Sequence, residues 1–167
     1  MGVFYAEGEE TVFGTGGRDT MYGNEGNNRL FGDSGNDRLY GGAGNDYLAG
    51  SSGRDTLTGG EGYDDFYFGL SALSKKYDII TDYNKKFDAI LLSQYTFVGI
   101  GKVNGWMKPS AFWQGTKAHD ENDRVIYNPK NGIVYYDPDG TGSASATPFL
   151  KVGAGRKMSA KDFWVDF

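Results

Sequence analysis

Cysteine is absent from this sequence of 167 residues, and histidine occurs once, as His119. Without thiols the chain can form neither disulfide bonds nor thiolate metal sites. A single histidine excludes the paired histidines of an H-E-x-x-H zinc protease, and the sequence contains neither a G-x-S-x-G nucleophile motif nor a Walker loop. These absences predict that the chain is not an enzyme.

Long apolar runs and an excess of basic charge are missing as well. No run approaches the roughly 18 apolar residues of a membrane span, and the N-terminus lacks the pattern of a signal peptide. The formal net charge is −5, and the 17 basic residues are scattered. We therefore expect no stable membrane span and no nucleic-acid partner. A secreted form of the chain would need an export address other than a signal peptide.

Glycine, in contrast, is abundant, with 27 residues, and much of it recurs in phase. Six contiguous nonapeptides fill residues 14–67: GTGGRDTMY, GNEGNNRLF, GDSGNDRLY, GGAGNDYLA, GSSGRDTLT and GGEGYDDFY. Glycine holds the first and fourth positions of each. The sixth position is Asp19, Asn28, Asp37, Asp46, Asp55 or Asp64, and the eighth is Met21, Leu30, Leu39, Leu48, Leu57 or Phe66. A faded copy begins at Tyr5, with Glu10 in the acidic position.

Each nonapeptide predicts six residues of tight turn followed by three of strand, with the eighth side chain pointing inward. Two nonapeptides make one coil, and successive coils would stack about 4.8 Å apart as two parallel sheets around a thin core. The predicted fold class is all-β: a parallel β-roll in residues 1–69, followed by a β-rich C-terminal cap in residues 70–167. A flexible glycine-rich linker is the alternative, but a linker has no reason to keep one acid and one large apolar residue in phase.

The stacked turns would bring like charges together. Residues 1–70 carry 12 acidic and 4 basic side chains, whereas residues 71–167 carry 10 acidic and 13 basic ones. One edge of the roll would align Asp19, Asp37 and Asp55, and the other would align Asn28, Asp46 and Asp64. No basic residue recurs in phase to neutralise them, so a hard divalent cation is expected, and Ca²⁺ suits a shell of six to eight oxygens better than Mg²⁺ does. The alternative, an Asn/Asp ladder without metal, leaves the repulsion uncompensated.

The pattern resembles G-G-x-G-x-D-x-U-x, the calcium-binding repeat of the RTX (repeats-in-toxin) family. The resemblance implies that each Ca²⁺ lies between two turns one coil apart, bound by sixth-position side chains and turn carbonyls. It pairs Asp19 with Asp37, Asp37 with Asp55, and Asp46 with Asp64. The Asn28–Asp46 position would bind more weakly because Asn28 carries no charge. The implied metal ligands are Asp19, Asp37, Asp46, Asp55, Asp64, Asn28, Gly14, Gly16, Gly32, Ser34, Gly41, Gly42, Ala43, Gly44, Gly50, Ser51, Ser52, Gly53, Gly60 and Gly62.

Beyond Phe68 the phase of nine is lost, and the sequence predicts a cap over the exposed end of the solenoid. Residues 77–93 predict two strands around a turn at 84–86, and residues 125–127 and 133–136 predict a β-hairpin. These segments resemble the regions that follow the repeats in RTX proteins. We expect five aromatic residues in the cap core, with a sugar-stacking platform as the alternative: Trp106, Phe112, Trp113, Tyr135 and Tyr136.

The stretch DPDGTG (137–142) is similar to the start of an EF-hand loop. Thr141, however, fills the third ligand position, and no glutamate follows at the required distance. We prefer an Asp/Gly turn here, and a further metal site is the alternative.

Together, the residues and the resemblance predict a secreted, extracellular module that folds on binding Ca²⁺ and supports type I secretion of its parent protein. The implied partners are calcium ions and a type I ABC exporter, and the ending SAKDFWVDF (159–167) resembles a type I export signal. Two alternatives stay open. One is a polysaccharide-binding or adhesin module, in which outward Tyr22 and Tyr40 would stack on sugar. The other is the C-terminal part of a secreted enzyme whose catalytic domain is absent here.

Overall fold

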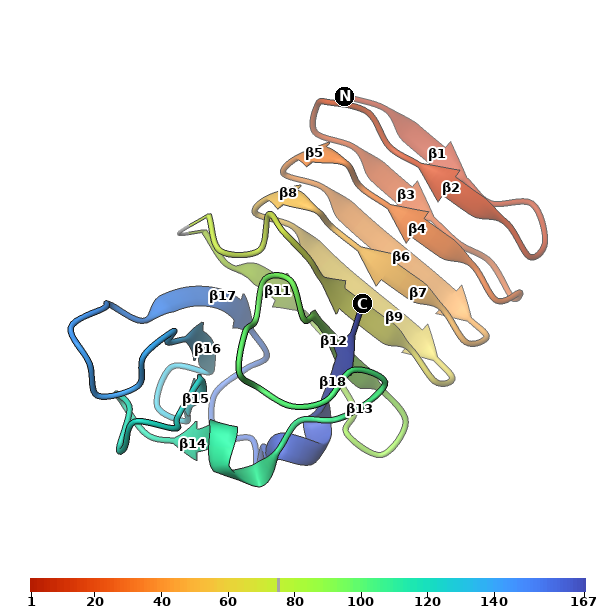
Figure 1. The fold of residues 1–167 in the computed structure, drawn as a ribbon. Helices are drawn as coiled ribbons and strands as arrows, with labels where there is room; N and C mark the ends of the chain where they lie inside the picture. The colour runs from red at the N-terminus through yellow and green to blue at the C-terminus, as the bar shows by residue number, and fades with distance from the viewer. Residues whose placement is uncertain (75) are drawn as a thin grey trace.

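The computed structural model describes residues 1–74 and 76–167. Nearly all regular structure in these residues is β-strand, arranged in two large sheets and one two-stranded sheet. The predicted parallel β-roll with a β-rich region after it is confirmed, and Figure 1 shows the coils stacked as rungs from the N-terminus towards that region. None of the described residues forms a helix long and apolar enough to cross a membrane.

The strands of the two large sheets alternate along the repeats. The first sheet has the order β1 (Val3–Tyr5), β3 (Thr20–Tyr22), β6 (Arg38–Ala43), β9 (Thr56–Glu61), β11 (Asp78–Ile80), β17 (Thr147–Lys151), β16 (Ile133–Tyr136), β15 (Val125–Asn128) and β14 (Phe112–Gln114). The second has the order β13 (Gly105–Trp106), β18 (Phe163–Asp166), β12 (Ala89–Ser93), β10 (Asp65–Phe68), β7 (Tyr47–Ala49), β4 (Arg29–Phe31) and β2 (Thr11–Phe13). The small sheet pairs β5 (Ser34–Gly35) with β8 (Ser52–Gly53), and two short 3₁₀ helices are η1 (Pro109–Ala111) and η2 (Ala160–Asp162).

The parallel register confirms that two nonapeptides make one coil. Met21 lies opposite Leu39, and Leu39 lies opposite Leu57, so partners in adjacent coils are 18 residues apart. The eighth-position side chains point inward and fill the space between the sheets. All six are 0% exposed: Met21, Leu30, Leu39, Leu48, Leu57 and Phe66.

On the first sheet, the ninth-position tyrosines point outward and stack on one another. The Tyr22 and Tyr40 rings lie 5.1 Å apart with an interplanar angle of 8°, and Tyr5 stacks on Tyr22 at 5.3 Å. The predicted placement of Tyr22 above Tyr40 is confirmed. Because the rings cover each other's faces, the ladder offers a sugar mainly ring edges and hydroxyl groups.

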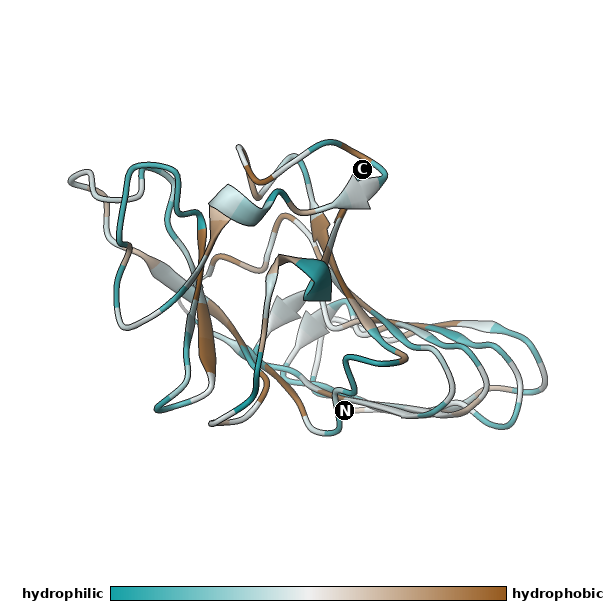
Figure 2. Cartoon of the chain, turned by 90° about the horizontal axis from the view of Figure 1, so that it is seen from below, coloured by the Kyte–Doolittle hydropathy of each residue, from teal (hydrophilic) through white to brown (hydrophobic). Residues whose placement is uncertain are grey.

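The sheets continue past the last nonapeptide. Strand β11 pairs in parallel with β9, and β12 pairs in parallel with β10, so Ile80 and Ile90 extend the inward rows beyond Leu57 and Phe66. The predicted hairpin is confirmed, because β15 and β16 pair antiparallel. Strand β18, close to the C-terminus, lies between β12 and β13 and buries Phe163 and Val165. Figure 2 shows strongly hydrophobic segments in the strands of this region and more polar turns along the edges of the roll.

The expectation that all five aromatic residues lie in the cap core is wrong for Tyr135, which is only partly buried and lines a cavity, and for the two tryptophans. Tyr136 is buried and Phe112 packs against the core, whereas Trp106 and Trp113 are 52% and 37% exposed. Trp106 lies edge-on to Trp164 on the outer face of the second sheet, and Trp113 stacks on His119. Strand alternation places these tryptophan rings outside, whereas residue type alone favoured the core.

Candidate metal centre

The sixth-position side chains form two buried rows, one at each edge of the roll. All are at most 2% exposed, although five of them are carboxylates: Asp19, Asn28, Asp37, Asp46, Asp55 and Asp64. The strand register places Asp19, Asp37 and Asp55 before β3, β6 and β9, and the other three before β4, β7 and β10. The two predicted alignments are therefore present in the structure.

Each row is held by hydrogen bonds from one coil to the next. The Oδ1 atom of Asp37 accepts from the N–H of Asp19 at 2.7 Å, and that of Asp55 accepts from the N–H of Asp37 at the same distance. On the other edge, Asp46 Oδ1 accepts from Asn28 N–H at 2.7 Å, and Asp64 Oδ1 accepts from Asp46 N–H at 3.0 Å. One oxygen of each carboxylate is thus fixed by the backbone.

The second oxygen of these carboxylates has no partner. Oδ2 of Asp37, Asp46, Asp55 and Asp64 is shielded from solvent and accepts no hydrogen bond. A buried carboxylate oxygen without a donor is strongly unfavourable unless a cation compensates it. No lysine or arginine forms an ion pair with these groups within residues 1–74 and 76–167. Four unpartnered oxygens in two rows are what a set of hard cations requires.

The glycine positions allow backbone carbonyls to reach across to the neighbouring coil. Gly53 has φ +145°, and a Cβ atom there would overlap the carbonyl oxygen of Gly35. In the same way, the carbonyls of Gly42 and Gly44 lie against Gly60 and Gly62. The carbonyl oxygens of Gly42 and Gly44, which are predicted calcium ligands, are therefore packed closely against the adjacent turn. A larger residue at Gly60 or Gly62 would push the two coils apart.

The remaining predicted carbonyl donors lie in the turns between the strands, in the short strands β5 and β8, or in the last residues of β6, which include Gly41. Ser34 and Ser52 belong to the short parallel pair of β5 and β8, in which the turns themselves hydrogen-bond across coils. Ala43 closes β6 and donates its N–H to the carbonyl of Asn24 at 2.8 Å. The other members of this set are Gly14, Gly16, Gly32, Gly41, Gly50 and Ser51.

Two further acids extend the rows, and the sequence reasoning missed them. Asp78 Oδ1 accepts from Asp55 N–H at 2.8 Å, and Asp88 Oδ1 accepts from Asp64 N–H at 3.4 Å. Asp82 joins the second edge by accepting from the N–H groups of Gly59 and Gly60. A signal was present, because D-I-I at 78–80 and D-A-I at 88–90 repeat the D-x-U ending of the nonapeptide. The coil is longer here, with 23 or 24 residues between equivalent acids instead of 18. A search for repeats at a fixed spacing of nine residues therefore does not find these two acids.

The first coil differs, because side-chain amides lie where carboxylates lie elsewhere. Nδ2 of Asn28 donates to the carbonyl of Gly8, and Nδ2 of Asn24 donates to the carbonyls of Ala6 and Gly8, at 2.6 to 3.0 Å. The Glu10 carboxylate accepts from the backbone of Glu7 instead of facing Asn28. Amide donors thus satisfy carbonyls that a cation would otherwise bind.

The electrostatics of the rows follow their burial. Burial raises the pKa of Asp55 and of Asp64 to about 7, and that of Asp78 to about 8. Burial also raises the pKa of Asp37 and of Asp46. Neighbouring acids in the same row raise the pKa of most of these groups further. Without a cation, the fold therefore disfavours the ionised form of these five carboxylates, whereas the hydrogen bond from the Thr15 side chain lowers the pKa of Asp19.

Comparison with known proteins agrees with this geometry. The model of the RTX calcium-binding nonapeptide repeat family matches residues 5–39 and 31–66. Residues 5–66 belong to the RTX repeats. RTX repeats bind Ca²⁺, and the unpartnered carboxylate oxygens and carbonyl-lined turns of this tract fit that ion. The RTX tract is thus a calcium-binding structural module.

No curated protein matches the sequence. Among solved structures, the chain is similar to the solution structure of the AlgE6R3 subunit from the Azotobacter vinelandii mannuronan C5-epimerase. The two are 25% identical over 93% of this chain and 77% of that one, with a TM-score of 0.45.

The rows predict how many ions each acid serves. Asp55 lies between Asp37 and Asp78, whereas Asp19 has a carboxylate neighbour on one side only and faces the N-terminal Gly2 on the other. Asp55→Asn should therefore remove two bound Ca²⁺ per chain and Asp19→Asn one, counted by native mass spectrometry or calorimetric titration. Asp65→Asn is the matched control. Because Asp65 lies on the outer face of the sheet, this variant should bind as many Ca²⁺ ions as the parent. Equal losses from the first two variants would contradict ions placed between adjacent coils.

The raised pKa values predict how metal-free protein responds to acid. A carboxyl whose folded pKa exceeds its ordinary value of 3.8 keeps its proton in the fold after the unfolded chain has lost it. The stability that the protonated carboxyls of Asp55, Asp64 and Asp78 contribute is fully present below about pH 4, and it is lost as the pH rises through about 7 to 8. Chelated protein should therefore show more β-structure by circular dichroism at about pH 5 than at about pH 8. Unchanged or weaker spectra on acidification would contradict this.

Proposed function

We propose that this chain is a module that remains unfolded at low calcium concentration, folds on binding Ca²⁺ outside the cell, and supports type I secretion of its parent protein. The observation that supports it best is the set of four buried carboxylate oxygens without any donor. Such groups oppose folding until cations arrive, so calcium concentration decides whether the roll forms. Circular dichroism of the chain in chelator and in calcium tests the proposal.

The metal sites proposed in this roll combine the predicted ligands with the acids that extend the rows. On the first edge, the residues that would hold ions are the pairs Asp19 and Asp37, Asp37 and Asp55, and Asp55 and Asp78. On the second edge they are the pairs Asn28 and Asp46, Asp46 and Asp64, and Asp64 and Asp88. Turn carbonyls would supply further oxygens, and a bound ion would supply the positive charge that the buried carboxylates lack. The residues themselves position the oxygens and exclude solvent.

We also propose that the chain acts outside the cell, as a roll (residues 1–69) followed by a cap (residues 70–167), and has no catalytic role of its own. The RTX character of the repeats supports secretion, and the calcium level outside cells suits sites of extracellular affinity. A polysaccharide-binding role is a second candidate. The observation that favours it is Trp106, which is 52% exposed and lines a cavity of about 570 Å³ together with Lys102 and Lys108. The stacked tyrosine ladder favours it less.

Export is proposed to depend on an address in residues 159–167. The structure shows that removing residues 162–167 would be a poor test, because Phe163 and Val165 are buried in a central strand of the second sheet. A better variant replaces the outward-facing Trp164, Asp166 and Phe167 by serine and keeps the buried residues.

This triple variant should stay inside cells that express a matching type I exporter, while the parent chain reaches the medium. The purified variant should still gain β-structure on adding Ca²⁺, because every proposed ligand lies upstream. Secretion at the parent level would place the address elsewhere.

A further inference from the structure

The loop of residues 137–142 carries two acids that the roll does not use. Asp137 is 4% exposed, and the hydrogen bond that its carboxylate accepts comes from within the same loop, from the N–H of Asp139 at 3.3 Å. Oδ1 of Asp139 is shielded from solvent and has no hydrogen-bond partner, as in the rows of the roll. Asp139 Oδ2 accepts from Ala144 N–H at 3.0 Å, so the loop fixes one oxygen and leaves the other free.

The two carboxylates lie close together without a compensating base. Burial raises the pKa of Asp137, and the neighbouring Asp139 carboxyl raises it further. Lys117 lines the same cavity, but no ion pair joins it to either acid within the described parts of the chain. Two adjacent carboxylates, one of them almost fully buried, require either a shared proton or a cation.

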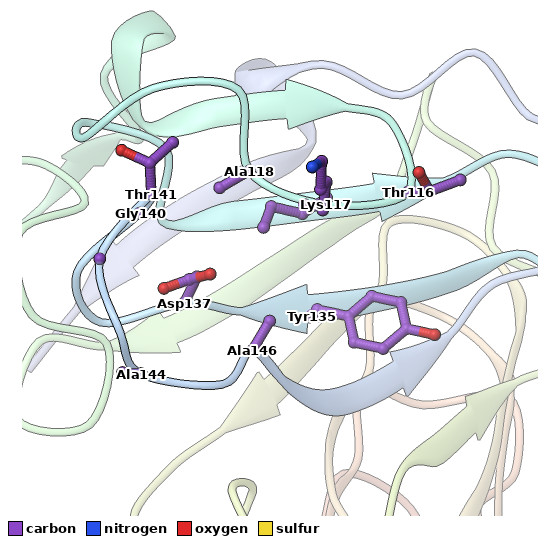
Figure 3. A pocket seen from close by; sticks show the side chains of 11 residues that line it. Thr116, Lys117, Ala118, Tyr135, Asp137, Gly140, Thr141, Ala144 and Ala146 are labelled. Carbon is purple, nitrogen blue, oxygen red and sulfur yellow. The ribbon is translucent and has the colours of Figure 1, made fainter.

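The surroundings offer further oxygens and enough space. The cavity holds about 490 Å³ and is lined by Asp137, Gly140, Thr141 and Gly142, and Figure 3 shows the Asp137 carboxylate inside this lining. Gly140 has φ +66°, and a Cβ atom there would overlap the carbonyl oxygen of Asp120, so a second loop brings its backbone against the first. Gly142 leaves room for the Asp139 carboxylate that lies over it.

We propose that Asp137 and Asp139 bind one Ca²⁺ in the C-terminal region, at a site separate from the rows of the roll. The Thr141 hydroxyl and water from the open side of the cavity are oxygens available to complete the shell. The donor set contains only hard oxygens, which select Ca²⁺ over transition metals.

A neighbouring group of His119, Asp120 and Asp123 is not part of this site. Its ligand atoms lie within 4.8 Å of one another. The Asp123 carboxylate, however, already accepts from the N–H groups of His119 and Asp120, at 2.6 and 2.9 Å, so it closes a turn. The His119 ring stacks on Trp113 with centroids 4.4 Å apart.

The test counts ions on the whole chain. The double variant Asp137→Asn, Asp139→Asn should bind one Ca²⁺ fewer than the parent by native mass spectrometry at saturating calcium. The control Asp166→Asn should bind as many ions as the parent. An unchanged count overturns the proposal, as does a variant that melts at lower temperature yet keeps every ion, because the acids would then serve only the loop's hydrogen bonds.

A second measurement covers the case in which the double variant fails to fold. Trp113 lies against the loop that contacts Gly140, so Tb³⁺ bound at this site should luminesce on excitation through tryptophan. Trp113→Phe should lose most of that emission and should bind the same number of Ca²⁺ ions as the parent. Emission that is absent in the parent, or unchanged in Trp113→Phe, overturns the proposal.

Discussion

In a calcium chelator at neutral pH the roll is expected to be largely disordered, and addition of Ca²⁺ near millimolar concentration should restore β-structure in one cooperative transition. The acidic, glycine-rich repeats bury few apolar side chains per coil, and their buried carboxylates repel one another without a counterion. Circular dichroism during a calcium titration measures the change. A chelated chain with a full, heat-stable β-spectrum would rule out calcium-driven folding.

The expected size of this effect follows from binding linkage. Extracellular calcium sites have Kd values on the order of 10⁻⁴ M, so at about 1 mM Ca²⁺ each stabilises the fold by about 1.4 kcal/mol. Six such positions would contribute about 8 kcal/mol, which lies within the roughly 5–15 kcal/mol of total stability typical of a domain. Removing calcium therefore removes an amount comparable with the whole stability of a domain of this size.

Among alanine substitutions of the roll's glycines, Gly53→Ala should have the largest effect, because its added Cβ would make the closest contact. The residue has φ +145°, and its added Cβ would overlap the Gly35 carbonyl of the coil before it. The conformational cost of about 1–3 kcal/mol adds to an overpacking cost of about 1–3 kcal/mol. The calcium concentration at the folding midpoint should rise at least several-fold in a titration followed by circular dichroism.

Gly16→Ala is the matched control for this substitution. It lies in an equivalent turn, but a Cβ there meets nothing within 4 Å and its φ is not positive. Its midpoint should stay close to that of the parent. If both variants shift alike, the close approach of the coils does not limit folding.

The repeats made most of the roll predictable. Leu39 and Asp37 recur with their counterparts at a fixed spacing, and that spacing determines both the inward row and the alignment of the acids. Asp78 and Asp88 were missed because extra residues lengthen the coil before them, although the backbone returns to the same register afterwards. The exposure of Trp106 depends on which strand pairs with β18, and such long-range pairing leaves no periodic trace in the sequence.

The two ends of the roll are not equivalent. At one end β11 and β12 join the stack, and their acids Asp78 and Asp88 complete the last rung. Among the described residues, β1 and β2 are the strands furthest from this junction, and Tyr5 and Phe13 are 68% and 64% exposed. A one-dimensional stack that joins a larger folded region at one side has a polarity. Nucleation is then favoured where the rung next to that region forms, and growth proceeds coil by coil away from it.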